Sequence, residues 1–329
     1  MRFFLRRLSF YLVALIVAAS INFFLPRIMP GDPLQIMFGQ QMARMTPETV
    51  DALRATYGFT DEPLIQQYFQ YLGSVARWDL GLSVREFPKP VSEILREGLI
   101  WTVVLVGSST LIAFTLGSFL GLLASWFRGS WYDSIATPLS LVMQSIPSVV
   151  ICLTALFIFA LGLGWFPTGY GYDPQLDPGW NLEFISSVAH HAVLPVLTLV
   201  VFQMAAFMIP MRANMINLLG EDYITMGRAK GLSSSRVLFQ YGARNALLPS
   251  VTTLAMALGF VVGGSFITEV VFNYPGIGYI MFQAILSRDY PLIQGHMLIF
   301  TMVMLIANLI ADLLYVILDP RVRTGSGDA

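Results

Sequence analysis

The sequence predicts an all-α integral membrane protein with six transmembrane helices. Of its 329 residues, 56% are apolar and only 12% are charged, whereas about a quarter of the residues in a soluble domain are charged. Its charge-free stretches are also long enough to cross a bilayer, which takes about 20 mostly apolar residues in a helix. This composition excludes a disordered chain and argues against a soluble enzyme. A net charge of −1 offers no basic field for nucleic acid.

Six stretches that lack Asp, Glu, Lys and Arg supply the predicted spans. The third is longer than one span requires, and we expect its helix to end near Leu163, where Gly162, Gly164 and Pro167 interrupt it. The sixth continues past Asp312 to residue 318. The six stretches are Leu8–Pro26, Leu99–Phe127, Ser134–Tyr172, Phe184–Met211, Asn245–Thr268 and Pro291–Ala311.

The distribution of basic residues predicts that both termini are cytoplasmic. With the N-terminus inside, the inner segments carry eleven Lys and Arg side chains, and the two short outer loops carry only Arg288. Basic residues mark the cytoplasmic side of short loops. The first span follows Arg6 and Arg7 as a signal peptide would, but its apolar run continues through Ile21–Leu25. We therefore expect an uncleaved transmembrane helix.

The segment between the first two spans, residues 27–98, is polar and is predicted to be helical and extracytoplasmic. It holds 16 of the 39 charged side chains. Thr46 followed by Pro47 is typical of a helix start, and Pro63 is expected to begin a second helix. A third short helix is expected over Lys89–Gly98. The segment can serve as a packed cap over the outer helix ends or as a docking surface for an extracytoplasmic partner, and both interpretations stay open.

The cytoplasmic segment after the fourth span is predicted to contain a separate short helix. Gly220 interrupts the fourth helix, Tyr223–Lys230 favours helix, and Gly231 supplies a C-terminal stop. Ser233 can then cap a following helix over Arg236–Leu248. The short helix would extend roughly 13 Å. Because it has no wide apolar face to bury in lipid, we favour a protein-docking element over an interfacial membrane helix.

Four stretches of this sequence resemble the permease subunits of ABC importers, in the dipeptide and oligopeptide branch. The segment Tyr223–Ser233, followed by Arg244–Pro249, is similar to their coupling loop. Thr225-Met226-Gly227 stands where the broad importer motif has Glu-Ala-Ala, and Leu248-Pro249 lies a turn later than that motif's Leu-Pro. The shifted form is itself similar to the peptide branch. The other three stretches, in matching order and spacing, are Pro30–Pro33, Asp79–Ser83, and Glu269–Gly278 with Arg288–Pro291.

The resemblance implies a type I ABC importer permease fold and one of two transmembrane subunits that form a translocation path. The implied partners are a second permease subunit, expected to be a homologous different chain, two ABC ATPase subunits and an extracytoplasmic solute-binding protein. The implied location is the cell membrane of a bacterium or archaeon. The substrate would be a dipeptide or oligopeptide, or a related solute such as an oligosaccharide, because relatives that import oligosaccharides share the architecture.

The chain itself is not expected to be an enzyme or to hold a cofactor. Its only lysines, Lys89 and Lys230, do not complete a glycine-rich phosphate loop ending in Lys-Ser or Lys-Thr. ATP and Mg²⁺ are therefore expected on the partner ATPases, and energy would arrive through contact with the short helix. The residues expected to couple to the ATPase are Asp222, Tyr223, Thr225, Gly227, Arg228, Ala229, Lys230 and Gly231.

The expected domain organisation follows from these assignments. The N-terminal transmembrane helix takes residues 1–26, and the extracytoplasmic segment takes residues 27–98. A five-helix transmembrane domain takes residues 99–318 and includes the coupling loop 217–249. The cytoplasmic tail takes residues 319–329.

Two other classes of membrane protein are weighed against the importer. An ion-coupled secondary transporter would have inverted repeats or broken helices with charges at the bilayer midplane, and the sequence shows neither. Asp312 shares a helix face with Asn308 and Tyr315 and is expected near the inner interface, where a packing contact is favoured over a proton relay. An intramembrane hydrolase would require a catalytic or metal constellation. Adjacent His190 and His191 point to different helix faces and lack a nearby ligand partner.

Overall fold

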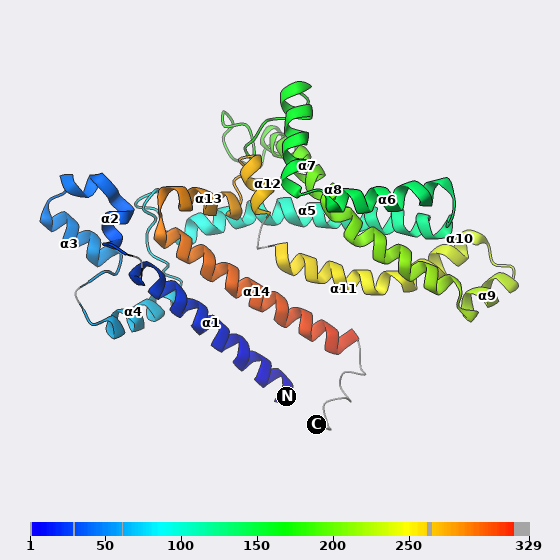
Figure 1. The fold of residues 1–329 in the computed structure, drawn as a ribbon, viewed down its shortest axis with the longest axis horizontal. Helices are drawn as coiled ribbons and strands as arrows, with labels where there is room; N and C mark the ends of the chain where they lie inside the picture. The colour runs from blue at the N-terminus through cyan, green and yellow to red at the C-terminus, as the bar shows by residue number, and fades with distance from the viewer. Residues whose placement is uncertain (1, 29, 61, 262–264, 319–329) are drawn as a thin grey trace. The chain divides into compact units, whose positions relative to one another are not determined.

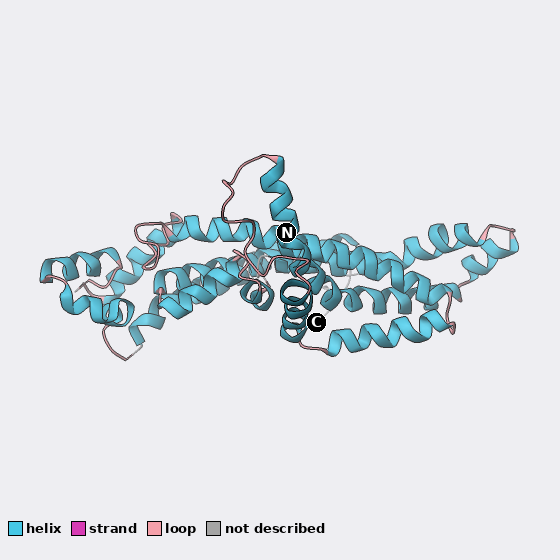
Figure 2. Ribbon diagram, turned by 90° about the horizontal axis from the view of Figure 1, so that it is seen from above, coloured by secondary structure: helices cyan, strands magenta, loops and turns pink. Residues whose placement is uncertain are grey.

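The structure, a computed structural model, describes residues 2–28, 30–60, 62–261 and 265–318, and their regular elements are helices (Figures 1 and 2). The predicted all-α class is therefore confirmed. Apart from helix, these residues contain one isolated β-bridge, between Leu82 and Pro90. The expected cytoplasmic tail, residues 319–329, lies outside the described residues.

Most helices follow one another with short connections, and the two longest connections are residues 77–90 and 163–181. The segments Leu156–Gly162 and Val237–Ala243 are π-helical and continue neighbouring α-helices, and Gly39–Arg44 is a 3₁₀ helix. The α-helices are α1 (Arg2–Ile28), α2 (Pro33–Phe38), α3 (Pro47–Thr56), α4 (Leu64–Ala76), α5 (Val91–Trp126), α6 (Trp131–Ser145), α7 (Ser148–Ala155), α8 (Leu182–Leu219), α9 (Asp222–Ala229), α10 (Ser234–Arg236), α11 (Arg244–Phe260), α12 (Phe266–Val271), α13 (Ile277–Ser287) and α14 (Tyr290–Leu318).

Four helices are long and apolar enough to cross a bilayer: α1, α5, α8 and α14. They match the first, second, fourth and sixth predicted spans. The fifth predicted span coincides with α11, which has 17 residues, and residues 262–264 that follow it lie outside the described residues. With the third span discussed below, the structure supports four or five spans, and the number six stays a prediction.

The third predicted span ends at Gly162, next to the expected stop at Leu163, but it is not one straight helix. Trp131–Ser145 and Ser148–Gly162 meet at an angle of 99°. Between them Ile146 adopts an extended backbone, with φ −77° and ψ 127°. The cause is Pro147, because a proline disfavours the helical conformation in the residue before it.

The helix expected over Lys89–Gly98 is not a separate element. Val91 begins α5, which runs unbroken to Trp126 across the predicted boundary between residues 98 and 99. No proline interrupts this run, and Gly98 lies where a Cβ atom would meet the Ile280 side chain and the backbone of Ile277. Close packing therefore explains the glycine, which does not end the helix here.

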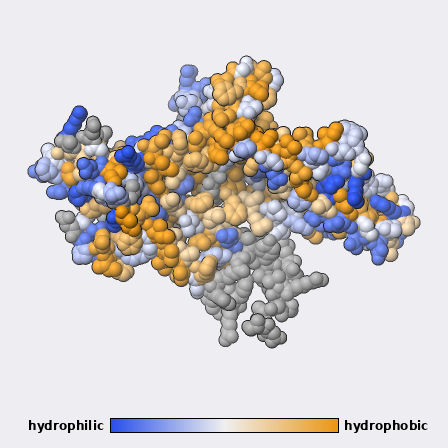
Figure 3. Space-filling model, viewed as in Figure 1, coloured by the Kyte–Doolittle hydropathy of each residue, from blue (hydrophilic) through white to orange (hydrophobic). Residues whose placement is uncertain are grey.

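Large apolar side chains remain exposed on the long helices. In the apolar windows of the four candidate spans, only 17–44% of the residues are buried. Broad apolar surface is visible in Figure 3. A helix surrounded by hydrocarbon satisfies its backbone internally and does not need a polar outer face. This surface fits helices that face lipid.

The contacts divide the described chain into two units. The first comprises the residues up to Thr102 and those from Pro275 onward, and the second is mainly Val103–Val261 with Ile267–Tyr274. This grouping follows contacts in space, so the linear division expected from the sequence stays a prediction.

In the first unit, α1 and α14 pack along one another and exchange two side-chain hydrogen bonds. The Asn22 amide donates to the Gln294 carbonyl at 3.2 Å, and the Gln294 amide donates to the Asn22 carbonyl at 2.6 Å. A separate core cluster joins the start of α5 to α13 and α14. Its buried members are Val91, Ile94, Leu95, Ile277, Ala284 and Leu292.

A buried carboxylate ties the outer segment to the start of α14. Asp289 is fully buried. Its Oδ2 accepts hydrogen bonds from the Ser83 hydroxyl at 2.5 Å and from the Val84 and Arg85 backbone N–H groups at 3.0 and 3.1 Å. Its Oδ1 accepts from the Leu292 N–H at 3.2 Å. The motifs that contain Ser83 and Asp289, residues 206 positions apart, therefore form one structural contact.

In the second unit, α5 and α8 approach closely at two glycines one turn apart. A Cβ atom at Gly117 would lie 2.5 Å from the Met204 carbonyl oxygen, and one at Gly121 would lie closer still to that of Met208. Small residues permit such backbone contact between membrane helices. The Phe114 and Phe207 rings pack edge to face beside it, with centroids 5.5 Å apart.

We predict that Gly121→Ala destabilises the protein, because the added methyl group would overlap a backbone carbonyl that cannot rotate away. The expected loss in the free energy of unfolding is about 1–3 kcal/mol. Gly107→Ala is the matched control, since Gly107 lies in the same helix and a Cβ atom there would have nothing within 4 Å. Thermal unfolding of the purified protein measures both, and equal melting temperatures would contradict the close-approach interpretation.

Candidate functional site

The short helix predicted between the fourth and fifth spans is observed as α9, Asp222–Ala229. It is set off from α8 at Gly220, where the backbone N–H bonds to carbonyls in the last turn of α8. Asp222 lies in the first turn, where the helix dipole favours a negative charge. Figure 1 shows α9 between the ends of α8 and α10.

Gly231 adopts a left-handed backbone with φ +74°. Its N–H donates to the Arg228 carbonyl at 2.9 Å, and the Leu232 N–H donates to the Gly227 carbonyl at 3.3 Å. These bonds close the helix as a glycine C-terminal cap does. Nothing lies within 4 Å of a Cβ built at Gly231, so a side chain would meet backbone strain and no steric clash.

The two faces of α9 differ in exposure. Ile224 and Gly227 are buried. The outer face carries both charges and small or apolar side chains, and Met226 is 57% exposed. The exposed members are Asp222, Thr225, Met226, Arg228, Ala229 and Lys230. This is a firmly seated helix with a mixed, water-exposed surface.

Two polar contacts hold the ends of α9 in place. The Asn245 side chain at the start of α11 donates a hydrogen bond to the Tyr223 hydroxyl at 3.3 Å. The Arg228 guanidinium lies over the Trp126 ring at the end of α5, 5.9 Å from its centroid. Tyr223 and Arg228 therefore position the helix as well as contributing to its surface.

An apolar cluster lies where the elements that flank α9 pack against one another. Its buried residues come from α5, α8, the π-helical segment and α11, so these elements are packed as one body. They are Leu122, Met211, Met215, Leu238, Ala243 and Ala246. Gly242 adjoins Met215, whose sulfur would lie 2.8 Å from a Cβ at that position.

The helix that follows α9 begins as predicted. The Ser233 hydroxyl accepts a hydrogen bond from the Arg236 N–H at 3.4 Å. The run then continues through α10, the π-helical segment and α11 as far as Phe260. After the break at Gly231, helix therefore runs without interruption from Ser234 into the expected fifth span.

A buried ion pair, which the sequence analysis missed, fastens α6 to α8. The Arg212 guanidinium donates to both carboxylate oxygens of Asp133, at 2.6 and 2.9 Å. The Thr137 hydroxyl and the Gly129 N–H donate to the same carboxylate at 3.0 and 3.1 Å. The Asp133 side chain is only 8% exposed. One sequence pattern could have drawn attention to Asp133: Ser130 caps α6 three residues before this acid, which is typical of a helix start.

The other residues considered in the sequence do not form a second site among the described residues. His190 and His191 lie beside the carbonyl oxygens of Trp165 and Ser187, at 3.2 and 2.8 Å. Within the described part of the chain, no three His, Cys, Asp or Glu residues are grouped to hold a metal ion. The side chains of Asp312 and Tyr315 lie outside the described residues.

Comparison with known proteins identifies the family. The model of the binding-protein-dependent transport system inner membrane component matches residues 113–324, and the model of its N-terminal region matches residues 1–87. The chain belongs to this family. As a member, it is a permease subunit of an ABC importer in the peptide-transporter branch, and the ion-coupled alternative is not supported. It lies in a membrane.

The curated relatives match over nearly their full length. A putative peptide transport system permease of Brucella abortus is 34% identical over 321 residues, covering 97% of this chain and 98% of the relative. The oligopeptide transport system permease of Bacillus subtilis is 33% identical over 320 residues, with the same coverage. The glutathione transport system permease of Salmonella choleraesuis is 32% identical over 322 residues, also covering 97% and 98%.

We predict strong energetic coupling between Asp133 and Arg212 in this permease. Arg212→Ala would leave the buried Asp133 carboxylate without its charged partner and lower stability by about 3 kcal/mol or more. Asp133→Ala should cost less, because the Arg212 side chain is 25% exposed. The double variant should lose less than the sum of the two, with a coupling energy of about 1–3 kcal/mol. Unfolding measurements on the three variants test this.

The salt bridge between Lys89 and Glu97 is the control for this double-mutant cycle. Its charged atoms lie 2.6 Å apart, the same distance as Asp133 and Arg212, but the side chains are 29% and 55% exposed. Its coupling should be below about 1 kcal/mol. Additive losses at Asp133 and Arg212 would contradict the buried-pair assignment.

Proposed function

We propose that this permease forms half of the translocation path for short peptides and receives the force of ATP hydrolysis through α9. The peptide substrate is supported by the names of the relatives, two of which are called peptide or oligopeptide permeases and one a glutathione permease. An oligosaccharide substrate has no such support among these relatives.

The observation that carries the coupling role is the construction of α9. The helix is held between two breaks, at Gly220 and Gly231, and it packs against the π-helical segment Val237–Ala243 and against α8. A force applied to its exposed face would reach α8 through this packing, and α11 through the π-helical segment that continues into it. A rigid element joined to two membrane helices can convert motion of a partner into a change in the path.

The proposed assembly contains a second, homologous permease, two ATPase subunits and an extracytoplasmic solute-binding protein. ATP and Mg²⁺ bind to the ATPase subunits in this proposal, and the permease performs no covalent chemistry. The solute-binding protein delivers the peptide from outside. ATP binding closes the ATPase pair, moves the two α9 helices together and switches the side on which the path is open.

We predict that Gly231→Val uncouples transport from ATP hydrolysis. Valine at φ +74° costs about 1–2 kcal/mol in the backbone. The packed membrane helices should stay folded despite this loss of stability, whereas a helix of two turns should lose its fixed orientation. Abundance in the membrane should be normal, while peptide uptake and ATPase stimulation by the loaded binding protein fall at least tenfold. Gly220→Ala is the control, because Gly220 has φ −87° and only an ordinary contact at a Cβ position.

Ala229→Glu should uncouple transport for an independent reason. Ala229 is exposed in this chain alone, and a new carboxylate would be desolvated without a partner when the ATPase docks. The same substitution at the exposed Ala52 of α3 is the control and should transport normally. Wild-type uptake by Ala229→Glu at normal abundance would refute the docking role of α9.

We predict that α9 and the C-terminus face the cytoplasm and that residues 27–98 face outside. The single cysteine, Cys152, is buried, so we expect it to react little with a thiol label. Glu48→Cys should react with an impermeant maleimide on intact cells, whereas Ser234→Cys should react only after the membrane is opened. Both positions are exposed. The reverse pattern would overturn the orientation derived from the basic residues.

A further inference from the structure

Helix α4, Leu64–Ala76, carries no charged side chain, although the segment around it is rich in charge. Residues 27–98 hold 16 of the 39 charged side chains, and Glu62 and Arg77 lie close to the two ends of the helix. The 13 residues of α4 are apolar, aromatic, glutamine, glycine or serine. A surface helix in water normally carries charged residues on the face opposite the core. The composition of α4 therefore indicates surroundings other than bulk water.

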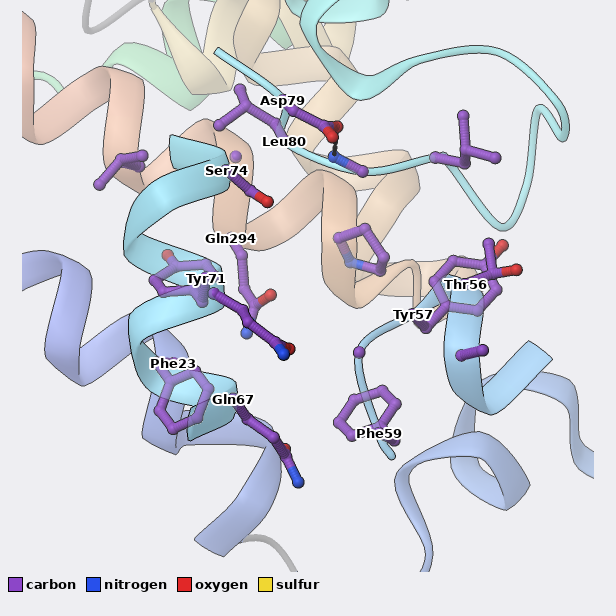
Figure 4. Close-up of a pocket in the computed structure, with 18 of the residues that line it drawn as sticks. Phe23, Thr56, Tyr57, Phe59, Gln67, Tyr71, Ser74, Asp79, Leu80 and Gln294 are labelled. Carbon is purple, nitrogen blue, oxygen red and sulfur yellow. Dashed lines mark hydrogen bonds between the residues drawn. The ribbon is translucent and has the colours of Figure 1, made fainter. Parts of the chain in front are cut away.

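One face of α4 packs against α1. The Tyr68 hydroxyl lies 2.7 Å from the Ser20 hydroxyl, within hydrogen-bond distance. The Tyr71 ring lies 5.6 Å from the Phe23 ring. Figure 4 shows Gln67 and Tyr71 beside the polar cavity of about 480 Å³ that they help to line. This face is therefore directed at the protein.

A second face of α4 carries an exposed apolar stripe. Positions spaced by four, three and four residues share one face of a helix, and here they are Ile65, Phe69, Leu72 and Ala76. Ile65 is 64% exposed and Phe69 is 63% exposed. Ala76 is also exposed, and Leu72 is half-buried. Beyond this stripe, Gln66 and Gln70 are exposed on a polar third face.

The apolar stripe continues the surface of α1 that fits contact with lipid. The Tyr68 ring stacks on Phe24 of α1, with centroids 6.1 Å apart, and its centroid lies 5.8 Å from that of Phe69. Phe24 belongs to the first candidate membrane span and is itself exposed. Other exposed apolar side chains in this part of α1 are Ile21, Leu25 and Ile28. Figure 3 shows apolar surface over α4. Aromatic contacts therefore join the two helices into one apolar surface.

The contact with Ser20 sets the depth of α4 relative to α1. Ser20 lies six residues before Pro26, where the charge-free stretch of α1 ends. Six residues of helix extend about 9 Å. Interfacial helices bury their apolar face to a similar depth, about 5–10 Å into the boundary between headgroups and acyl chains. Trp78, just after α4, is exposed and is of a type enriched at this boundary.

We propose that α4 is an interfacial helix whose apolar stripe is covered by acyl chains of the outer leaflet. Its glutamine face, Gln66 and Gln70, lies toward the headgroups and water, and Tyr68 and Tyr71 hold the helix against α1. A protein partner would account for an exposed apolar stripe, but not for its continuity with α1 or for its depth. Only the choice of leaflet rests on the orientation proposed above.

The test measures depth with bimane, a small fluorophore, attached at Phe69→Cys. The purified transporter complex is placed in phosphatidylcholine discs whose lipids carry a nitroxide near the top of the acyl chain, and exposed cysteines of the partner subunits are replaced. Gln70→Cys is the matched control, because Gln70 is the next residue and lies about 100° around the helix. Quenching at position 69 should exceed quenching at position 70 about threefold or more.

A charge placed in the stripe tests whether contact with lipid holds α4. With the fluorophore moved to Ile65→Cys, Phe69→Glu should lower the quenching about threefold or more, because an ionised carboxylate is costly in hydrocarbon. Gln70→Glu should leave the quenching unchanged. The variants are compared at equal subunit content and melting temperature. The first measurement stands without them, since it changes only exposed positions.

Two results would overturn the proposal. One is equal quenching at positions 69 and 70. The other is loss of the quenching at position 69 when purified solute-binding protein is added, which would make the stripe a docking surface for that protein. Reversed labelling at Glu48→Cys would refute the orientation alone, because lipid in both leaflets carries the nitroxide.

Discussion

A helix inside hydrocarbon must pair nearly every backbone N–H and C=O group within itself, because no water is present to replace a missing partner. This constraint makes each break in a helix informative. Among the interruptions in the described chain, one at Ile146–Pro147 lies within an expected span, whereas those at Gly220 and Gly231 lie between the fourth and fifth expected spans; in each case the local residues explain the interruption. Two of these three breaks delimit α9, the one short helix proposed to contact the ATPase.

Within each unit, polar contacts at helix ends complement the glycine contacts between helices. Asp289 gathers backbone N–H groups from the outer segment and from α14, and Asp133 joins the turn after α5 to α8. Both carboxylates are buried and fully engaged, so each fixes a loop that apolar packing alone would leave loosely defined. In the second unit, the Asp133 contact lies on the same helix, α8, that leads to the coupling loop.

In the second unit, α9 presents an exposed face on a base of packed helices, which is suited to the proposed role of receiving a force. In the first unit, α1, α4 and the start of α14 enclose a polar cavity that adjoins an apolar one.

The sequence by itself determined the helical class, the family, the caps at Thr46 and Ser233, and the stop at Gly231 after the short helix. These depend on composition and on interactions between residues close in the chain, so they can be inferred without a fold. It did not reveal that Pro147 bends the third span, because proline is common within membrane helices and its effect depends on neighbouring helices.

Only the tertiary structure decided the remaining features. The pairing of Asp133 with Arg212 joins residues 79 positions apart, and the bonds from Asp289 to the Ser83 region span about 205. The polar cavity likewise requires side chains from α1, α4 and α14. A local pattern cannot specify such contacts, because they arise when packed helices bring distant side chains within hydrogen-bonding distance and bury them there.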